Sequence, residues 1–295
     1  MNLLQAIVLG LVEGITEYLP VSSTGHLIVA AAAVGLHGSE HDKAVKTFEI
    51  AIQGGAILAV LALYWPRFMQ MIRGVLGRDG DGLRLAINIA IAFVPAAVLG
   101  LLLKKTIEEH LFNPRTVAWA LMIGGVYMFA VEYLRARDHR LFHERTLRTF
   151  GAPEGLSIQR LTPLQALFIG CLQCVALIPG TSRSMMTITG GLFVRLTPRA
   201  AAEFSFLLGM PTLLAATLYA MYKNFKEAKA EHTPNFIELL GVLPVIVGFA
   251  VAAVSAFLAV KWLVGMLGRW GLAPFAIYRV LAGAVLLLII RFGGL

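Results

Sequence analysis

The chain has 295 residues, of which 58% are hydrophobic and 14% charged, with a mean hydropathy of +0.77 and a net charge of +8. A soluble domain carries about 25% charged residues, so this composition excludes an ordinary soluble protein and predicts an integral membrane protein. The positive charge does not indicate nucleic-acid binding, because no recognition motif accompanies it and most basic residues lie between apolar runs.

Apolar runs close to the length of a membrane-spanning helix, about 20 residues, recur along the chain. None of them shows the alternating pattern of a transmembrane barrel strand. We therefore predict an all-α polytopic membrane protein. Its spans are built on the runs Phe48–Tyr64, Leu83–Leu103, Thr116–Leu134, Phe204–Met221, Leu239–Trp262 and Pro274–Ile290.

Two further apolar segments are interrupted by a proline, in "YLPVSST" at Pro20 and in "LIPGTSRS" at Pro179. Proline has no amide hydrogen and clashes with the preceding helical turn, so each helix should break there. The two pieces of each segment are too short to span a membrane alone. We predict two re-entrant helix–loop–helix segments, since irregular backbone at membrane depth needs protein or water around it.

The two interrupted segments also match each other. "QAIVLGLVEGITEYLPVSSTG" is similar to "QALFIGCLQCVALIPGTSRSM", and the serines that follow the prolines, Ser23 and Ser182, match after a slip of one residue. Later runs repeat in the same order, which favours an internal duplication. We predict one integral membrane domain made of two repeats, 1–135 and 161–295, joined by a cytoplasmic connecting loop at 136–160.

Three transmembrane helices in each repeat place the second repeat upside down relative to the first. The two re-entrant segments then enter from opposite faces and their tips meet near the midplane, an inverted-repeat architecture typical of transporters. Lys and Arg are more frequent on the side that holds the loops 65–84, 134–162, 193–203 and 261–274. By the positive-inside rule this side is cytoplasmic and both termini lie outside.

Glu13 and Glu17 lie four residues apart, so a helix would place both carboxylates on one face. An ionised acid near the centre of a bilayer costs ~2.5–3.5 kcal/mol, and two together need a cation, a protonation change or a polar cavity. The alternatives are a divalent metal site and a pair of satisfied polar groups that join helices.

Four polar side chains follow the first proline: Ser22, Ser23, Thr24 and His26. A Ser/Thr cluster after a break favours an N-cap for the next helix, and the amides at a helix start favour an anion. His26 lies one turn from the hydroxyls. It is a candidate acid, base or nucleophile, and alternatively a packing residue.

The second interruption reads "PGTSRSMMT", with hydroxyls at Ser182 and Ser184. Arg183 always carries its charge, so burying it demands an anion, and its fork fits a phosphate with two hydrogen bonds. That anion is either a glutamate of the first tip, in a structural ion pair, or a ligand phosphate while the acids hold a metal. An acidic tip opposite a basic one is the asymmetry that a diphosphate would engage.

"LVEGITEYLPVSSTGH" and "PGTSRSMMT" resemble the two signature motifs of the bacitracin-resistance-type undecaprenyl-diphosphate phosphatases. The resemblance extends over the whole chain, including "KTFEI", "AAEFSF" and "YRVLAG". It implies a multi-pass enzyme of the bacterial inner membrane that hydrolyses undecaprenyl diphosphate to undecaprenyl phosphate and inorganic phosphate. This reaction recycles the lipid carrier for peptidoglycan synthesis and confers bacitracin resistance. The resemblance also implies a divalent cation, Mg²⁺ or Ca²⁺, and a site open to the periplasm.

The expected site combines residues of both motifs. Carried over by motif, the functional residues are Glu13, Glu17, Ser23, His26, Ser182, Arg183 and Thr187. We expect catalytic roles for Glu17, Ser23, His26 and Arg183, metal binding by Glu13 and Glu17, and substrate binding by Ser22, Thr24, Ser182, Ser184, Thr187 and Arg183. The attacking group stays open between Ser23, His26 and water, as does the glutamate that binds metal.

A second function stays open on the residues alone. Inverted repeats and broken helices also favour a transporter or flippase of a lipid phosphate. The expected partners are a polyprenyl diphosphate substrate and membrane lipid, without nucleic acid. The oligomeric state stays open, with a homodimer among the candidates.

Overall fold

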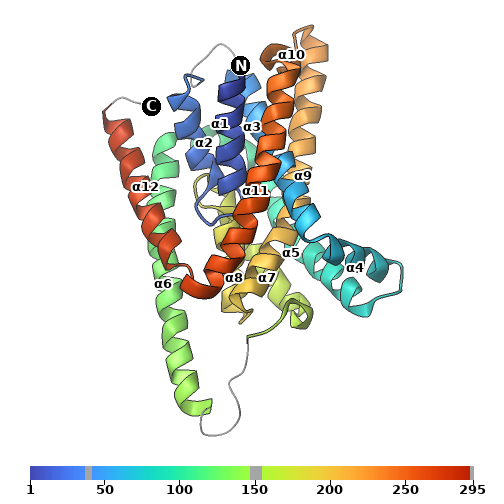
Figure 1. Ribbon diagram of the computed structural model, residues 1–295, viewed down its shortest axis with the longest axis vertical. Coiled ribbons are helices and arrows are strands. Elements are labelled where there is room, and N and C mark those ends of the chain that lie inside the picture. Colours follow the sequence, from blue (N-terminus) through green and yellow to red (C-terminus); the bar gives the residue numbers. More distant parts are fainter. Residues whose placement is uncertain (37–41, 147–154, 293–295) are drawn as a thin grey trace. The chain divides into compact units, whose positions relative to one another are not determined.

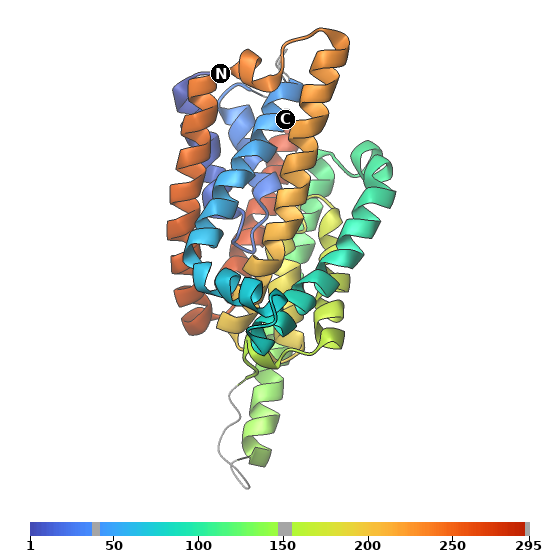
Figure 2. The same cartoon turned by 90° about the vertical axis from the view of Figure 1, so that its right-hand side faces the viewer.

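The computed structural model describes residues 1–36, 42–146 and 155–292 (Figures 1 and 2). Six helices among these residues are long and apolar enough to cross a membrane. They are α3 (Asp42–Leu63), α5 (Gly80–His110), α6 (Pro114–Thr146), α9 (Pro198–Glu231), α11 (Val242–Trp270) and α12 (Ala273–Arg291). Each contains most of one predicted span, which confirms an all-helical, multi-pass membrane protein.

The helix α6 continues beyond the predicted end of its span at Leu134 as far as Thr146. The added residues include Arg, Glu and Leu, which favour a helix in water as well as in a membrane. The polar residues after Leu134 therefore end the apolar span, while the helix continues through them. The first part of the predicted connecting segment 136–160 is helical, and the short helix η1 (Ile158–Arg160) closes it. Residues 147–154 of that segment lie outside the described residues.

The predicted loop 65–84 contains a helix, α4 (Trp65–Val75). Its second residue is a proline, which favours the first turn of a helix. The exposed side chains of Trp65, Ile72 and Val75 share one face at helical spacing, while Arg67 and Arg73 lie on the other. An amphipathic helix of this kind typically lies in the plane of the membrane surface.

Both interrupted segments break where the prolines predict. The first consists of α1 (Leu3–Thr16) and α2 (Ser23–Ala33), which pack against each other (Figure 1). The second consists of α7 (Pro163–Gln173), the short helix η2 (Cys174–Leu177) and α8 (Arg183–Phe193), and α7 packs against α8. We call these two elements the first hairpin and the second hairpin.

One hydrogen bond closes each hairpin in the same way. Gln5 Nε2 donates to the carbonyl of Val34 over 2.9 Å, and Gln165 Nε2 donates to the carbonyl of Val194 over 3.4 Å. Each glutamine lies in the first turn of the first helix, and each valine directly follows the second helix. The chain therefore enters and leaves each hairpin at the same end, because the start of one helix is tied to the end of the other.

The backbone also fixes how the two hairpins correspond. Ser22 (φ 73°, ψ 101°) and Ser182 (φ 75°, ψ 114°) hold the same unusual conformation directly before α2 and α8. The one-residue slip predicted from the sequence is therefore wrong at this point, because Ser22 rather than Ser23 corresponds to Ser182. Matching serines by letter favoured the slip, whereas the backbone conformation follows the position at the head of the helix. Ser23 thus corresponds to Arg183.

The described chain forms two compact units. The first comprises residues 1–86 and 206–263 and contains the first hairpin. Within it, the chain turns from α9 through α10 (Phe236–Leu240) into α11 (Figure 2), and the amino terminus donates to the carbonyl of Leu240 over 3.4 Å. A Cβ on Gly14 of α1 would overlap Ser255 Oγ of α11. Small residues let these helices approach at a distance that larger ones forbid.

Among the described residues, the second unit comprises 87–205 and 264–292 and contains the second hairpin. In it α12 packs along α6 (Figure 1). Glycines again set the spacing: a Cβ on Gly125 would lie 2.6 Å from Val280 Cγ2, and a Cβ on Gly283 would lie 2.6 Å from Met122 Cγ. Backbone therefore comes close to backbone along this helix pair.

Replacing Gly14 with alanine tests the close contact of α1 and α11. The new methyl group would overlap Ser255 and the carbonyl of Ala252, so we expect Gly14→Ala to lower the free energy of unfolding by ~1–3 kcal/mol. Gly265→Ala in α11 is the matched control, because nothing lies within 4 Å of its Cβ position and a helical alanine is favoured by ~0.5–1 kcal/mol. Thermal unfolding in detergent measures both, and equal midpoints would contradict this packing.

Candidate active site

The two predicted acids lie at the carboxyl end of α1. Glu13 is in its last turn and Glu17 directly follows it. Both are buried, with 0% and 8% of their surface exposed. Because α1 stays helical through Glu13 and the amide of Glu17 donates to the carbonyl of Glu13 over 2.9 Å, the two side chains are one helical turn apart, as the spacing predicts.

Ser23 contacts Glu17 across the break between α1 and α2. The Ser23 hydroxyl donates to Glu17 Oε2 over 2.6 Å, a short hydrogen bond typical of a charged acceptor. A hydroxyl next to a carboxylate is the arrangement in which a base takes the proton of a nucleophile. This geometry therefore favours Glu17 as the base for Ser23.

His26 is held by the first turn of its own helix. Its Nδ1 lies 2.7 Å from the carbonyl oxygen of Ser22. A carbonyl only accepts hydrogen bonds, so Nδ1 carries the hydrogen and Nε2 is the basic nitrogen of the neutral ring. Any proton transfer or attack by His26 would therefore proceed through Nε2.

Ser22 has a backbone role at this tip. Its φ of 73° is unusual for a residue with a side chain, and such strained residues gather at functional sites. Its hydroxyl does not cap α2, and 4% of its surface is exposed. Thr24, the second residue of α2, is half-buried. The cap that the Ser/Thr cluster predicted is thus absent at Ser22.

The second hairpin has that cap. Ser182 Oγ accepts from the amide of Met185 over 3.3 Å and lies 3.0 Å from Ser184 Oγ. Both serines are buried. They satisfy the start of α8 and place two hydroxyls beside its amides, where the helix dipole favours an anion.

Arg183 is tied to α9. Its Nη1 donates to the carbonyl oxygen of Ser205 over 3.0 Å. One turn along α8, the hydroxyl of Thr187 lies 2.6 Å from the hydroxyl of Ser205. This hydrogen bond orients the guanidinium, whose planar fork of five N–H donors matches the geometry of carboxylates and phosphates.

The structure therefore gathers the predicted residues into two groups, one in each unit. The first hairpin brings together Glu13, Glu17, Ser22, Ser23 and His26, with Thr24 beside them in sequence. The second brings together Ser182, Arg183, Ser184 and Thr187.

Two further residues hold the second group, and neither was among the site residues predicted from the sequence. Ser205 carries the contacts of Arg183 and Thr187. Arg279 of α12, which is 0% exposed, donates to carbonyls of α6 and to the carbonyl of Gly180. A serine in an apolar run gives almost no sequence signal, whereas a charged residue inside a predicted span, such as Arg279, is a candidate for function by default.

The donors of the first hairpin fit a hard divalent cation. Two carboxylates and a hydroxyl are oxygen ligands, which Mg²⁺ and Ca²⁺ prefer. Among the described residues, no group of three or more His, Cys, Asp and Glu residues is placed to hold a metal. Two carboxylates are a ligand set that suits Mg²⁺, which typically takes one or two carboxylates and completes its shell with water and substrate phosphates.

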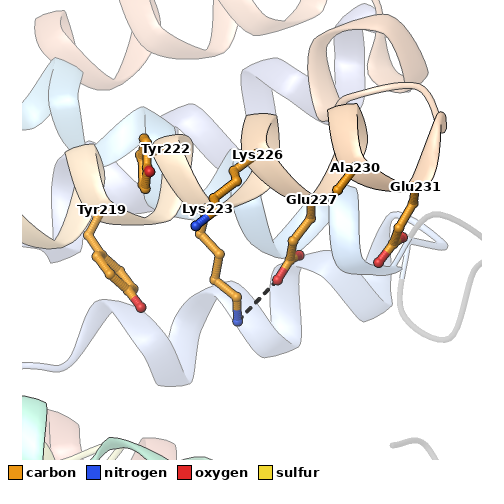
Figure 3. Close-up of a pocket in the computed structure, with 7 residues that line it drawn as sticks. All are labelled: Tyr219, Tyr222, Lys223, Lys226, Glu227, Ala230 and Glu231. Atoms are coloured by element: carbon orange, nitrogen blue, oxygen red, sulfur yellow. Dashed lines mark ion pairs between the residues drawn. The ribbon is translucent and has the colours of Figure 1, made fainter.

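A shallow hollow lies elsewhere, along the end of α9 (Figure 3). Its lining residues all come from this helix: Tyr219, Tyr222, Lys223, Lys226, Glu227, Ala230 and Glu231. Glu227 pairs there with Lys223 over 3.6 Å and with Lys43 of α3 over 2.9 Å. Tyrosines and lysines at the end of a span are typical of a membrane interface, and none of these residues belongs to the predicted site.

Comparison with known proteins gives one consistent result. A family model described as bacitracin resistance protein BacA matches residues 6–285. The chain is 46% identical over 282 residues to a Sorangium cellulosum protein named undecaprenyl-diphosphatase, covering 96% of this chain and 84% of the relative. It is 42% identical over 286 residues to a Neisseria gonorrhoeae protein of the same name, covering 97% and 94%. A Polaromonas protein of that name is 40% identical over 287 residues, covering 97% and 94%.

Replacing Thr187 tests how the second hairpin is anchored. Thr187→Val removes the hydroxyl that joins Ser205 and leaves the Ser205 hydroxyl buried, so we expect a loss of ~1–3 kcal/mol of unfolding free energy. Thr187→Ser keeps the hydroxyl and is the matched control, with a smaller loss. Denaturation in detergent measures both variants. A valine variant as stable as the serine variant would mean that this hydrogen bond does not anchor α8.

Proposed function

The chain belongs to the bacitracin resistance protein BacA family, and we propose that it is a membrane phosphatase that hydrolyses undecaprenyl diphosphate to undecaprenyl phosphate and inorganic phosphate. The names of its relatives support this activity. In the chain itself the contact between Ser23 and Glu17 carries the proposal, because it couples a hydroxyl to a buried carboxylate over 2.6 Å.

The proposed reaction has two steps. Ser23 Oγ attacks the terminal phosphorus while its proton passes to Glu17, the phosphoanhydride bond breaks, and undecaprenyl phosphate leaves. Water then attacks the phosphorus of the phosphoserine, and Glu17 returns its proton to Ser23 Oγ as the ester bond breaks. Both protons of the water leave with the inorganic phosphate. His26 stays anchored through Nδ1 and offers Nε2 as a further proton acceptor. Splitting one displacement into two is the usual benefit of a covalent nucleophile.

The second hairpin would bind the phosphates. Phosphoryl transfer needs in-line positioning and neutralisation of negative charge more than any other chemistry. Arg183, the hydroxyls of Ser182 and Ser184, and the amides at the start of α8 offer these groups. Thr187 and Arg183 both contact Ser205, so Thr187 helps to keep α8 and its arginine in place against α9. We place Ser22 and Thr24 beside the same phosphates at the start of α2.

A divalent cation, Mg²⁺ or Ca²⁺, would be held by Glu13 and Glu17. When bound, it supplies positive charge against the diphosphate and lowers the barrier to attack. Glu13 is fully buried at the end of α1, so a cation there would also offset the cost of its charge.

We further propose that the two hairpins are re-entrant, that the repeats 1–135 and 161–295 are inverted relative to each other, and that the two tips serve one diphosphate near the midplane. The closing hydrogen bonds of Gln5 and Gln165 support re-entry, because entry and exit share one end of each hairpin. The serines with positive φ support a duplicated ancestor. The distribution of Lys and Arg supports an orientation with both termini outside. From membership of the family we propose that the site opens to the periplasm, in the bacterial inner membrane.

Phosphate release from undecaprenyl diphosphate by the purified protein in detergent tests this function. We expect release without a second compartment, which a pure transporter would not produce. Ser23→Ala should lower turnover by roughly 10³-fold or more, and Glu17→Gln by ~10²–10⁴-fold. The double variant should be no slower than Ser23→Ala, since the two groups act together.

Glu231→Gln is the control for these substitutions, because it neutralises an exposed acid at the end of α9 and should keep wild-type turnover. A wild-type protein that releases no phosphate would contradict the hydrolase. A Ser23→Ala variant with full turnover would rule out Ser23 as the nucleophile and leave His26 or water as the attacking group.

Metal removal gives an independent prediction. Incubation with a chelator should stop phosphate release, and added Mg²⁺ or Ca²⁺ should restore it. Because Glu13 would be a ligand, Glu13→Gln should raise the concentration of cation needed for half-maximal release by about tenfold or more, the usual effect of disturbing a metal's surroundings. Release that is unaffected by chelation would rule out the cation.

A further inference from the structure

The turn that leads into the second hairpin's cap has a defined geometry. The amide of Thr181 donates to the carbonyl of Ile178 over 3.2 Å. Pro179 and Gly180 are the two central residues, and Gly180 has a φ of 92°. Proline followed by a residue with positive φ is the signature of a type II turn, which favours glycine at this position. Ser182 comes directly after Thr181, the last residue of the turn, and it also has positive φ.

The positive φ of Gly180 costs a glycine little, whereas the positive φ of Ser182 is unfavourable for a residue with a side chain. Such conformations persist where the surrounding structure determines them. Part of that support is steric, since a Cβ on Gly180 would lie 2.7 Å from the carbonyl oxygen of Val117 in α6. The turn therefore packs with its backbone directly on α6.

Arg279 supplies the remaining support. Its Nη2 donates to the carbonyl of Gly180 over 2.9 Å and to the carbonyl of Ala120 over 2.9 Å. Its Nε donates to the carbonyl of Leu121 over 3.3 Å. One guanidinium thus joins the turn to two consecutive residues of α6. The planar fork of arginine suits this arrangement, and a lysine ammonium would not reproduce it.

The chain makes room for this contact. Arg279 is 0% exposed, and a Cβ on Gly124 of α6 would overlap its guanidinium. A charge inside a membrane span is costly, and apolar packing between α6 and α12 would stabilise the pair more cheaply. A buried arginine that reaches the turn before the anion-binding cap is therefore better explained by function than by packing.

We propose that Arg279 is a positioning residue for the reaction: its hydrogen bond to Gly180 holds the turn so that Ser182, Arg183 and the first amides of α8 face the phosphates. Arg279 acts through the turn and does not touch the substrate in this arrangement. Its fixed positive charge also favours an anion at the adjacent start of α8. The inference rests on the proposed function for its substrate.

Substitutions at Arg279 test the proposal. Arg279→Lys keeps the charge and loses the fork, so we expect KM to rise roughly tenfold to hundredfold, the effect of losing one hydrogen bond to a charged group, with a smaller change in kcat. Arg291→Lys is the matched control, because Arg291 is the exposed last residue of the same helix, and its KM should equal that of the wild type.

A second substitution acts on the same contact while Arg279 is kept. Gly124→Ala should push the guanidinium away and raise KM like Arg279→Lys. In a variant that already carries Arg279→Met, Gly124→Ala should raise KM much less, because the guanidinium that the alanine displaces is absent. This non-additivity separates an effect through Arg279 from general damage to the packing of α6.

Inorganic pyrophosphate gives a readout that does not depend on turnover. Millimolar pyrophosphate should raise the Tm of the wild type, because a ligand of the folded state stabilises it. Arg279→Lys and Gly124→Ala should lose most of this shift while remaining folded. The inference is overturned if these variants keep the wild-type KM and the wild-type pyrophosphate shift. A wild type that binds pyrophosphate but releases no phosphate from the lipid would overturn the proposed function alone.

Discussion

A helix that stops inside an apolar protein leaves amide and carbonyl groups that must find partners. Everything at the candidate site depends on how the two hairpins meet this requirement. At the first break, Glu17 follows α1 and accepts from Ser23. At the second, Ser182 caps α8 and Arg279 holds the preceding turn. At the second break, the serine that caps α8 is therefore also one of the groups that we propose bind a phosphate.

The hairpins share a frame and differ in chemistry. Both are closed by a glutamine at the start and a valine carbonyl at the end, and both hold a serine with positive φ before the second helix. On this frame the first hairpin carries acids and a histidine, whereas the second carries an arginine and hydroxyls. In the proposed reaction the first hairpin would supply a base and a cation site, and the second would bind the anion. These are the two requirements of diphosphate hydrolysis.

The sequence predicted the helical class, the six spans and both breaks, because apolar length and proline act locally. It also predicted that Glu13 and Glu17 share a helix face, since that follows from helical spacing alone. It did not predict that Ser22 corresponds to Ser182. A positive φ depends on the position of a residue in the fold, and neither serine differs in residue type from its neighbouring serine. The contacts of Ser205 and Arg279 were missed for a different reason. They join segments far apart in the sequence, and only packing decides which carbonyl a donor reaches.

The central claim is that the acidic tip of the first hairpin and the basic tip of the second act on one diphosphate. Cysteine cross-linking tests it most directly. Thr24→Cys and Arg183→Cys are combined in a chain whose own Cys171 and Cys174 are replaced by alanine, treated with a short thiol-specific cross-linker, and mapped by mass spectrometry of the peptides. The account predicts an intramolecular link between the two tips. Efficient labelling of both cysteines without any such link would contradict it.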